Sequence, residues 1–273
     1  MIFRDPGTLL QHISTARLGW LGVIFLSLML SATLACGSSS TDGSDASKTA
    51  EASALSESSG AIKVVTTVSP ITSIVENIGG TKIILDGVVP EGVNSHTFAP
   101  APSVARSIAE ADLIVLNGLR LEEPTLEMAR ANKKQEAVIL SLGDQAISKD
   151  DWRFDFTFPE ANGQPNPHLW PDPMLALRYA ELVQQQLAEM DPSNADYYAA
   201  NLEIFRQRID ELDQGIATAV ATIPQVNRKL LTYHDSWAYF ALRYGMDVIG
   251  AVQPSNFSQT SVKEIAELID QLN

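Results

Sequence analysis

Short runs of β-branched and aliphatic residues alternate with helical segments from residue 62 onward, and this alternation constrains the fold most strongly. The runs predict strands over 62–68, 82–89, 112–116 and 137–142. The segments between them predict helices over 70–78, 103–111 and 121–132. A helix between successive strands is typical of a parallel sheet covered by helices. The predicted fold class is therefore α/β.

The second half of the chain predicts a further α/β unit behind a long helix. A loop over 150–173, rich in aromatic residues, proline and asparagine, precedes helices over 173–190 and 193–223. The second of these helices, with about thirty residues, would span roughly 45 Å, enough to connect two lobes. A second alternation then predicts strands over 229–233 and 246–252 and helices over 236–244 and 260–272. We expect an N-terminal lobe over 61–192, a linking helix over 193–223 and a C-terminal lobe over 224–273.

The predicted C-terminal lobe contains only two strands. Its last segment, 262–269, is an amphipathic helix that no strand follows. A sheet of two strands leaves an open edge and buries little apolar surface. We therefore expect either a very small second lobe or an incomplete one in a fragment of a longer protein.

The N-terminus has the pattern of an exported protein. Arg4 and Arg17 precede an uncharged stretch over 18–35, and Cys36, the only cysteine, follows. An uncleaved membrane anchor is one interpretation of the stretch, since eighteen apolar residues can span a bilayer. Thr33–Cys36 resembles a bacterial lipobox, in which the cysteine is acylated, although Thr33 stands where leucine is usual.

The composition after Cys36 favours cleavage and lipidation. Residues 37–60 are rich in serine, alanine, glycine and threonine, which is typical of a flexible tether. We predict a signal peptide over 1–35 and a lipidated Cys36 with its tether over 36–60. The product would be a lipoprotein anchored to the membrane through lipid on the extracytoplasmic face, at the cell surface or in the periplasm.

The charge of the chain excludes one class of partner. Its net charge is −14, and it becomes −15 when residues 1–35 are removed. Nucleic-acid binding depends on lysine and arginine neutralising phosphates, so no nucleic-acid partner is expected. An acidic surface is compatible with collecting cations but specifies no site.

Three of the four histidines lie in short, turn-rich segments. His96 and His168 follow proline, glycine and asparagine, His234 ends an apolar run, and His12 lies in the predicted signal peptide. Separations of 72 and 66 residues mean that only the fold could assemble a shared site, which excludes a zinc finger. Three neutral imidazoles suit Zn²⁺ or a similar divalent ion. A surface or core-rim position for each histidine is the other interpretation, and spacing alone leaves both open.

Five ordered blocks around these histidines resemble a known family, the zinc- and manganese-binding receptors of bacterial ABC importers. The resemblance covers Lys63 to Asn273. Its blocks are Thr67-Val68-Ser69-Pro70; Gly92 to His96 with Pro100 and Pro102; Ala111 to Val115 with Asn117-Gly118 and Leu121-Glu122; Pro167-His168-Leu169-Trp170 with Asp172-Pro173; and His234-Asp235-Ser236-Trp237 with Tyr239 and Tyr244-Gly245.

The resemblance implies two Rossmann-like lobes joined by one long helix, with the metal in the cleft. His96 and His168 would be ligands from the first lobe and His234 the first ligand from the second. Histidine at this third position is associated with zinc in the family. The family's fourth ligand is an acidic residue farther downstream, so we expect it beyond Asn273 and do not assign it to Glu267 or Asp270.

The function that the resemblance implies is capture and delivery of a metal ion without catalysis. The transported ligand would be Zn²⁺, with Mn²⁺ as the other candidate, and the partner an ABC-type permease in the membrane. We expect a monomer. A zinc hydrolase is the alternative, because three histidines and an open position also describe a catalytic site. It lacks an HExxH motif. A surface adhesin is a third possibility, without a repeat or exposed patch to favour it.

Residues next to the predicted ligands in sequence each have two alternative roles. Asp235 either orients an imidazole or caps the helix predicted to begin at Ser236, and the cap is favoured. Trp170 and Trp237 either shield the site or belong to the core.

Overall fold

The computed structural model describes residues 60–155, 157–253, 261–263, 265, 266 and 269. The predicted signal peptide, Cys36 and nearly all of the tether lie outside these residues, as does part of the helix predicted over 260–272. None of the helices in the described part of the chain combines the length and apolar character that a membrane span requires.

The first sheet is parallel and four-stranded, as predicted. Its strands lie in the order β2-β1-β3-β4, with Val64 of β1 opposite both Leu85 and Leu113. All four residues of β3 are buried, which is typical of a central parallel strand with helices on both faces. The bounds are β1 Ile62–Thr66, β2 Ile83–Gly87, β3 Leu113–Leu116 and β4 Val138–Ser141.

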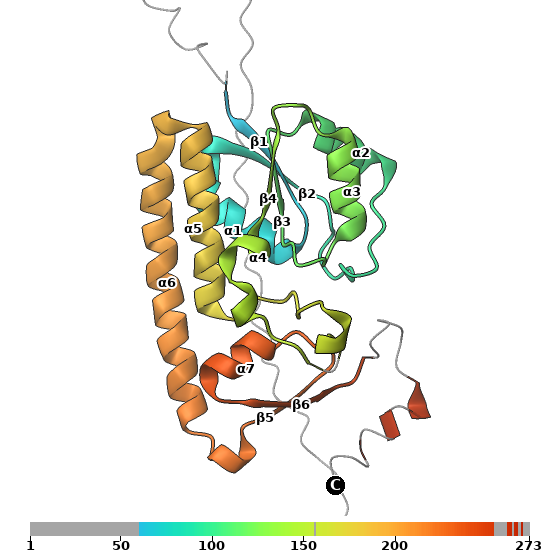
Figure 1. The fold of residues 1–273 in the computed structure, drawn as a ribbon. Coiled ribbons are helices and arrows are strands. Elements are labelled where there is room, and N and C mark those ends of the chain that lie inside the picture. Colours follow the sequence, from blue (N-terminus) through green and yellow to red (C-terminus); the bar gives the residue numbers. More distant parts are fainter. Residues whose placement is uncertain (1–59, 156, 254–260, 264, 267–268, 270–273) are drawn as a thin grey trace, which may run out of the picture. The chain divides into compact units, whose positions relative to one another are not determined.

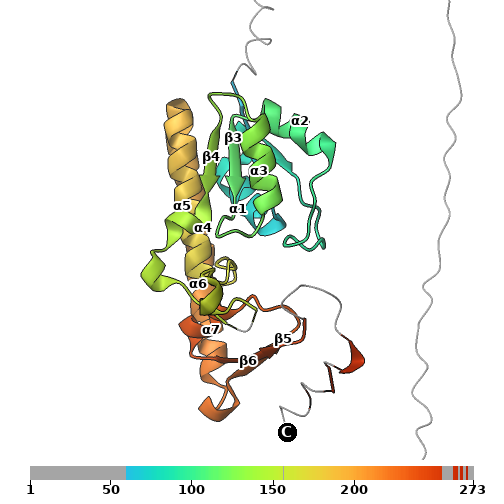
Figure 2. The same cartoon turned by 45° about the vertical axis from the view of Figure 1, so that its right-hand side comes forward.

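The direction of the connections places the helices. The chain moves outward from β1 to β2, then crosses back to β3 and continues to β4. Because such crossovers are right-handed, α1 lies on one face and α2 and α3 on the other (Figures 1 and 2). The helices up to the long pair are α1 Ser69–Gly79, α2 Pro102–Glu110, α3 Glu123–Asn132 and α4 Leu142–Ala146, with 3₁₀ turns at Gly80–Lys82, Lys149–Asp151 and Glu160–Asn162.

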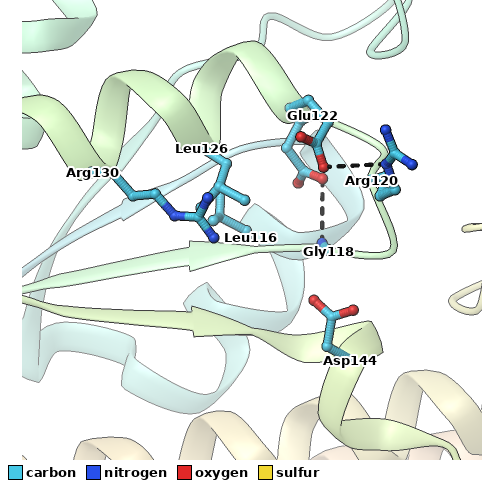
Figure 3. A pocket seen from close by; sticks show the side chains of 8 residues that line it. Leu116, Gly118, Arg120, Glu122, Leu126, Arg130 and Asp144 are labelled. Carbon is cyan, nitrogen blue, oxygen red and sulfur yellow. Dashed lines mark hydrogen bonds and ion pairs between the residues drawn. The ribbon is translucent and has the colours of Figure 1, made fainter.

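A buried carboxylate bridges the ends of β1 and β3, where the two strands lead to opposite sides of the sheet. Glu122 is 3% exposed and accepts hydrogen bonds from the Thr67 hydroxyl at 2.7 Å and from the backbone amide of Asn117 at 2.7 Å. The Gly118 amide donates to its second oxygen at 3.2 Å (Figure 3). These bonds hold a turn in which Leu119 and Arg120 have positive φ angles of 49° and 63°. The strained backbone is therefore fixed from inside the protein.

The same turn fixes the loop that carries His168. The side chain of Asn117 is fully buried, and its Nδ2 donates to the carbonyl of Pro167 at 2.9 Å. The hydroxyl of Tyr179, on helix α5 (Pro173–Met190), donates to Asn117 Oδ1 at 2.9 Å. The end of β3 thereby positions a segment that lies 50 residues farther along the chain.

Two long helices precede the second sheet. A four-residue connection, 191–194, contains the 3₁₀ turn Pro192–Asn194 and joins α5 Pro173–Met190 to α6 Ala195–Ala221. The two helices pack side by side. The turn Gln225–Asn227 leads into strand β5 Lys229–Thr232, which is followed along the chain by helix α7 Ala238–Tyr244 and strand β6 Asp247–Ala251. The strands β5 and β6 pair in parallel. The predicted parallel sheets and long helix are confirmed. Within the described residues, the second sheet contains these two strands only.

An ion pair connects α7 to the long helices. Arg243 Nε lies 2.6 Å from Asp172, the buried residue that caps α5, and Arg243 Nη1 lies 3.7 Å from Asp213 on α6. The Tyr244 hydroxyl donates to Asp213 at 2.7 Å. Helix α7 of the second sheet's lobe is therefore held against both α5 and α6.

Candidate metal centre

The three histidines that the sequence analysis singled out converge on one point. The Nε2 atom of His96 lies 3.1 Å from that of His168 and 3.3 Å from that of His234, and the last two are 3.0 Å apart. A tetrahedral zinc ion with Zn–N bonds of about 2.0–2.1 Å separates its nitrogen ligands by roughly 3.3 Å. The spacing therefore fits three ligands of a single ion. Within the described residues, no other cluster of three or more potential ligands meets this test.

Each histidine comes from a different connecting segment. His96 lies between β2 and α2, and its backbone amide donates to Asn94 Oδ1 at 3.0 Å. His168 lies just before α5 and is 3% exposed, whereas His234 follows β5. The loops after β2 and β5 start at the carboxyl ends of parallel strands, the edge at which α/β proteins bind ligands.

Two amides that the sequence analysis did not identify contact the imidazoles. Asn166 Oδ1 lies 2.6 Å from His168 Nδ1, and Gln253 Oε1 lies 2.7 Å from His234 Nδ1. Asn166 stands two residues before a histidine, a spacing typical of an Asx turn, so a signal was present. Gln253 is 19 residues from His234 and reaches it only because β6 pairs with β5, for which the sequence holds no local signal.

Asp235 does not cap a helix, so the favoured interpretation of this residue is wrong. Helix α7 begins at Ala238, with Trp237 at the capping position. The buried Asp235 carboxylate instead accepts a hydrogen bond from the Thr157 amide at 2.9 Å. Burial and the neighbouring Asp235 raise the pKa of Asp155 to about 7. Orientation of an imidazole by Asp235 stays a prediction.

Aromatic rings lie close to the imidazoles, and an open pocket of about 860 Å³ borders them. The Trp170 ring centroid lies 5.1 Å from that of His168, and the Phe158 centroid lies 5.8 Å from those of His96 and His168. Trp237 also lines the pocket. Trp170 therefore contacts the cluster and also packs against the core, whereas Trp237 only lines the pocket. Phe158 had no signal in the sequence.

The environment keeps two of the imidazoles neutral. Burial, followed by the proximity of His234, lowers the pKa of His96 to about 3. Burial, followed by the other two histidines, lowers the pKa of His168 well below 6.5. Because a histidine must be neutral to bind a metal ion, protons compete weakly for these two ligands near neutral pH.

This environment predicts an acid-resistant site. Unperturbed histidines would lose affinity by about tenfold per ligand and pH unit below 6.5. His96 and His168 should contribute almost none of this loss between about pH 7 and about pH 5.5, so the Zn²⁺ affinity should fall much less than for three ordinary imidazoles. Chelator-competition titrations at several pH values measure this. A fall as steep as that expected for three ordinary imidazoles would contradict the prediction.

The lowered pKa values have the opposite consequence for the metal-free fold. The unfolded chain binds protons at these histidines below about pH 6.5, whereas the folded chain does not. Their contribution to stability is therefore complete above pH 6.5 and is lost as the pH falls toward the folded value, about 3 for His96.

A parallel α/β sheet, a long helix and three converging imidazoles define a metal-ion-binding protein. Residues 64–273 match the family described as zinc-uptake complex component A, periplasmic (ZnuA). The chain belongs to this family.

The chain is similar to lipoproteins that are named for manganese. The manganese-binding lipoprotein MntA of Halalkalibacterium halodurans is 29% identical over 221 residues, covering 81% of this chain and 70% of the relative. The manganese ABC transporter substrate-binding lipoprotein PsaA of Streptococcus anginosus is 28% identical over 263 residues, covering 94% and 78%.

Solved structures show the same fold. A crystal structure of ZnuA has a TM-score of 0.67 and 30% identity, covering 77% of each chain. The periplasmic zinc-binding protein TroA of Treponema pallidum has a TM-score of 0.69 and 26% identity, covering 77% of this chain and 74% of the other. The chain is thus a metal-binding, substrate-binding protein of the ABC-importer class and not an enzyme. The hydrolase alternative is set aside.

Proposed function

We propose that the chain captures Zn²⁺ through His96, His168 and His234 and delivers it to an ABC permease. The observation that supports this most strongly is the convergence of three Nε2 atoms to within 3.0–3.3 Å of one another. Imidazole nitrogen is a borderline ligand that suits Zn²⁺, whereas Mn²⁺ prefers carboxylate and other oxygen ligands. For any given set of ligands Zn²⁺ also binds more tightly than Mn²⁺.

The position of the cluster supports delivery as well as capture. The histidines border an open pocket rather than an enclosed cavity. An ion that is to be transferred needs such a path. The three ligands also come from loops that belong to different parts of the fold, so a movement of any one loop would weaken the whole site.

A competition experiment tests the choice of metal. The purified chain is loaded with Mn²⁺ and titrated with Zn²⁺ against a chromophoric chelator of known affinity. We expect Zn²⁺ to displace Mn²⁺ when the free concentration of Zn²⁺ is far lower than that of Mn²⁺. Failure to bind either ion would refute the proposed function, and tighter binding of Mn²⁺ would refute the assignment of zinc.

The predicted lipid anchor has its own test. Cys36→Ala should release the protein from the membrane or mislocalise it, because acylation requires the thiol of this single cysteine. Ser38→Ala in the tether is the matched control and should leave fractionation unchanged. If the Cys36→Ala protein stays with the membranes like the wild type, the apolar stretch over 18–35 is the anchor.

A further inference from the structure

The side chain of Asn166 is fully buried and uses its whole hydrogen-bonding capacity at the metal centre. Its Oδ1 accepts from the His168 backbone amide at 3.0 Å and lies 2.6 Å from His168 Nδ1. Its Nδ2 donates to Asp155 Oδ2 at 2.6 Å and to the carbonyl oxygen of Asp235 at 3.0 Å. One amide therefore contacts the segments of two predicted ligands, since Asp235 directly follows His234.

The chemistry of these partners determines which way the amide faces. A backbone amide can only donate, so the Asn166 atom that faces it must be the oxygen. A carbonyl can only accept, so the atom that faces Asp235 must be the nitrogen. The same oxygen then requires a proton on Nδ1 of His168. A neutral imidazole carries one N–H, so the Nε2 lone pair of His168 faces His96 and His234.

We propose that Asn166 is a positioning residue that selects the metal-binding tautomer of His168 and couples the His168 loop to the His234 segment. The inference rests on the proposed metal-binding function. Gln253 selects the tautomer of His234 in the same way. Gln253 follows β6, which pairs with the strand before His234, so it does not connect His234 to the His168 loop. Asn166 reaches 69 residues along the chain to Asp235.

The tautomer can be measured directly in the metal-free protein by NMR of ¹⁵N-labelled histidine at a pH where His168 is neutral. In the wild type we expect His168 to carry its proton on Nδ1. Asn166→Ala should shift the population toward the Nε2–H form, because the acceptor is lost. Asn166→Asp keeps an acceptor oxygen and should retain the Nδ1–H form while losing both donated bonds.

Asn117→Ala is the matched control. Asn117 is also a fully buried asparagine, and it holds the same loop through the carbonyl of Pro167. Its loss should loosen the loop without changing the tautomer. An unchanged tautomer in Asn166→Ala, a shifted one in Asn166→Asp, or an equal shift in Asn117→Ala would each overturn the proposal. If Asn166→Ala does not fold, the Asn166→Asp result still decides it.

Zinc affinity provides the second measurement. Loss of a partner that orients a metal-binding histidine typically weakens binding by about 10–100-fold, and we expect this for Asn166→Ala. Asn166→Asp should also weaken binding, since the coupling to Asp235 is lost, and wild-type affinity in both Asn166 variants would overturn the proposal. Wild-type protein that binds no Zn²⁺ would refute the proposed function, and the tautomer measurement would still test the positioning role.

Discussion

His168→Ala should abolish tight Zn²⁺ binding, with a loss of affinity greater than about 100-fold. Even a supporting partner of a ligand typically contributes about 10–100-fold, and a ligand itself contributes more. His168 is the most buried of the three histidines, and its Nε2 lies within 3.1 Å of both others. Its removal leaves two imidazoles, fewer than the three or four protein ligands that zinc sites have. Isothermal titration measures the effect.

His96→Ala and His234→Ala should show losses of the same kind, because each also removes one nitrogen from the cluster. His12→Ala, carried on the full chain, is the matched control. It changes the fourth histidine, which lies in the predicted signal peptide, and should leave the affinity unchanged. Unchanged affinity in any one of the three cluster variants would remove that residue from the site.

Glu122→Ala should lower the free energy of unfolding substantially. The substitution leaves the Thr67 hydroxyl and the amides of Asn117 and Gly118 without their acceptor in a buried position. Each buried group that loses its partner costs about 1–3 kcal/mol, so a total of about 3 kcal/mol or more is expected. Urea denaturation followed by circular dichroism measures it.

Glu122→Gln is the matched variant, since it keeps one acceptor oxygen and nearly the same volume. It should be destabilised less than Glu122→Ala. Equal stability of the wild type and the alanine variant would show that water replaces the carboxylate and that the turn needs no internal acceptor.

The stability difference between the wild type and Glu122→Gln should also depend on pH. Burial raises the pKa of Glu122 to about 7, and the hydrogen bonds that the carboxylate accepts limit the rise. The folded state therefore holds a proton that the unfolded state releases above about pH 4.5. The contribution of Glu122 is complete below that pH and declines as the pH rises through 7, whereas glutamine does not titrate. We expect the advantage of the wild type to be smaller at pH 8 than at pH 5.

The local sequence was sufficient to predict the strands and most helices. Buried parallel strands are short β-branched runs, and β3, predicted over 112–116, spans Leu113–Leu116. Helix α5 has the predicted bounds, because Asp172-Pro173 combines a capping side chain with a favoured first residue. Helix α7 starts two residues later than predicted, and the mistaken role of Asp235 as its cap followed from this error.

The site was predictable only in part, because its contacts are long-range. Turn-rich segments indicated the three histidines, but their distances depend on how loops from separate strands meet. Glu122 stood in a recognised block of sequence without any sign of burial, since glutamate is ordinarily exposed. In the sequence, Asn166 resembles an ordinary turn residue, and its hydrogen bonds to Asp155 and Asp235 arise only in the folded chain.

The carboxylate that joins the ends of β1 and β3 has a consequence for what can bind between these two strand ends. In sheets of this topology, the place where neighbouring strands lead to opposite sides is where nucleotides and similar molecules usually bind. Here that place is filled from within by Glu122, and the pocket beside it measures about 210 Å³. Drug-sized ligands occupy roughly 300–1,000 Å³. The fold thus leaves no room for an organic molecule of that size at the position where sheets of this topology usually bind one.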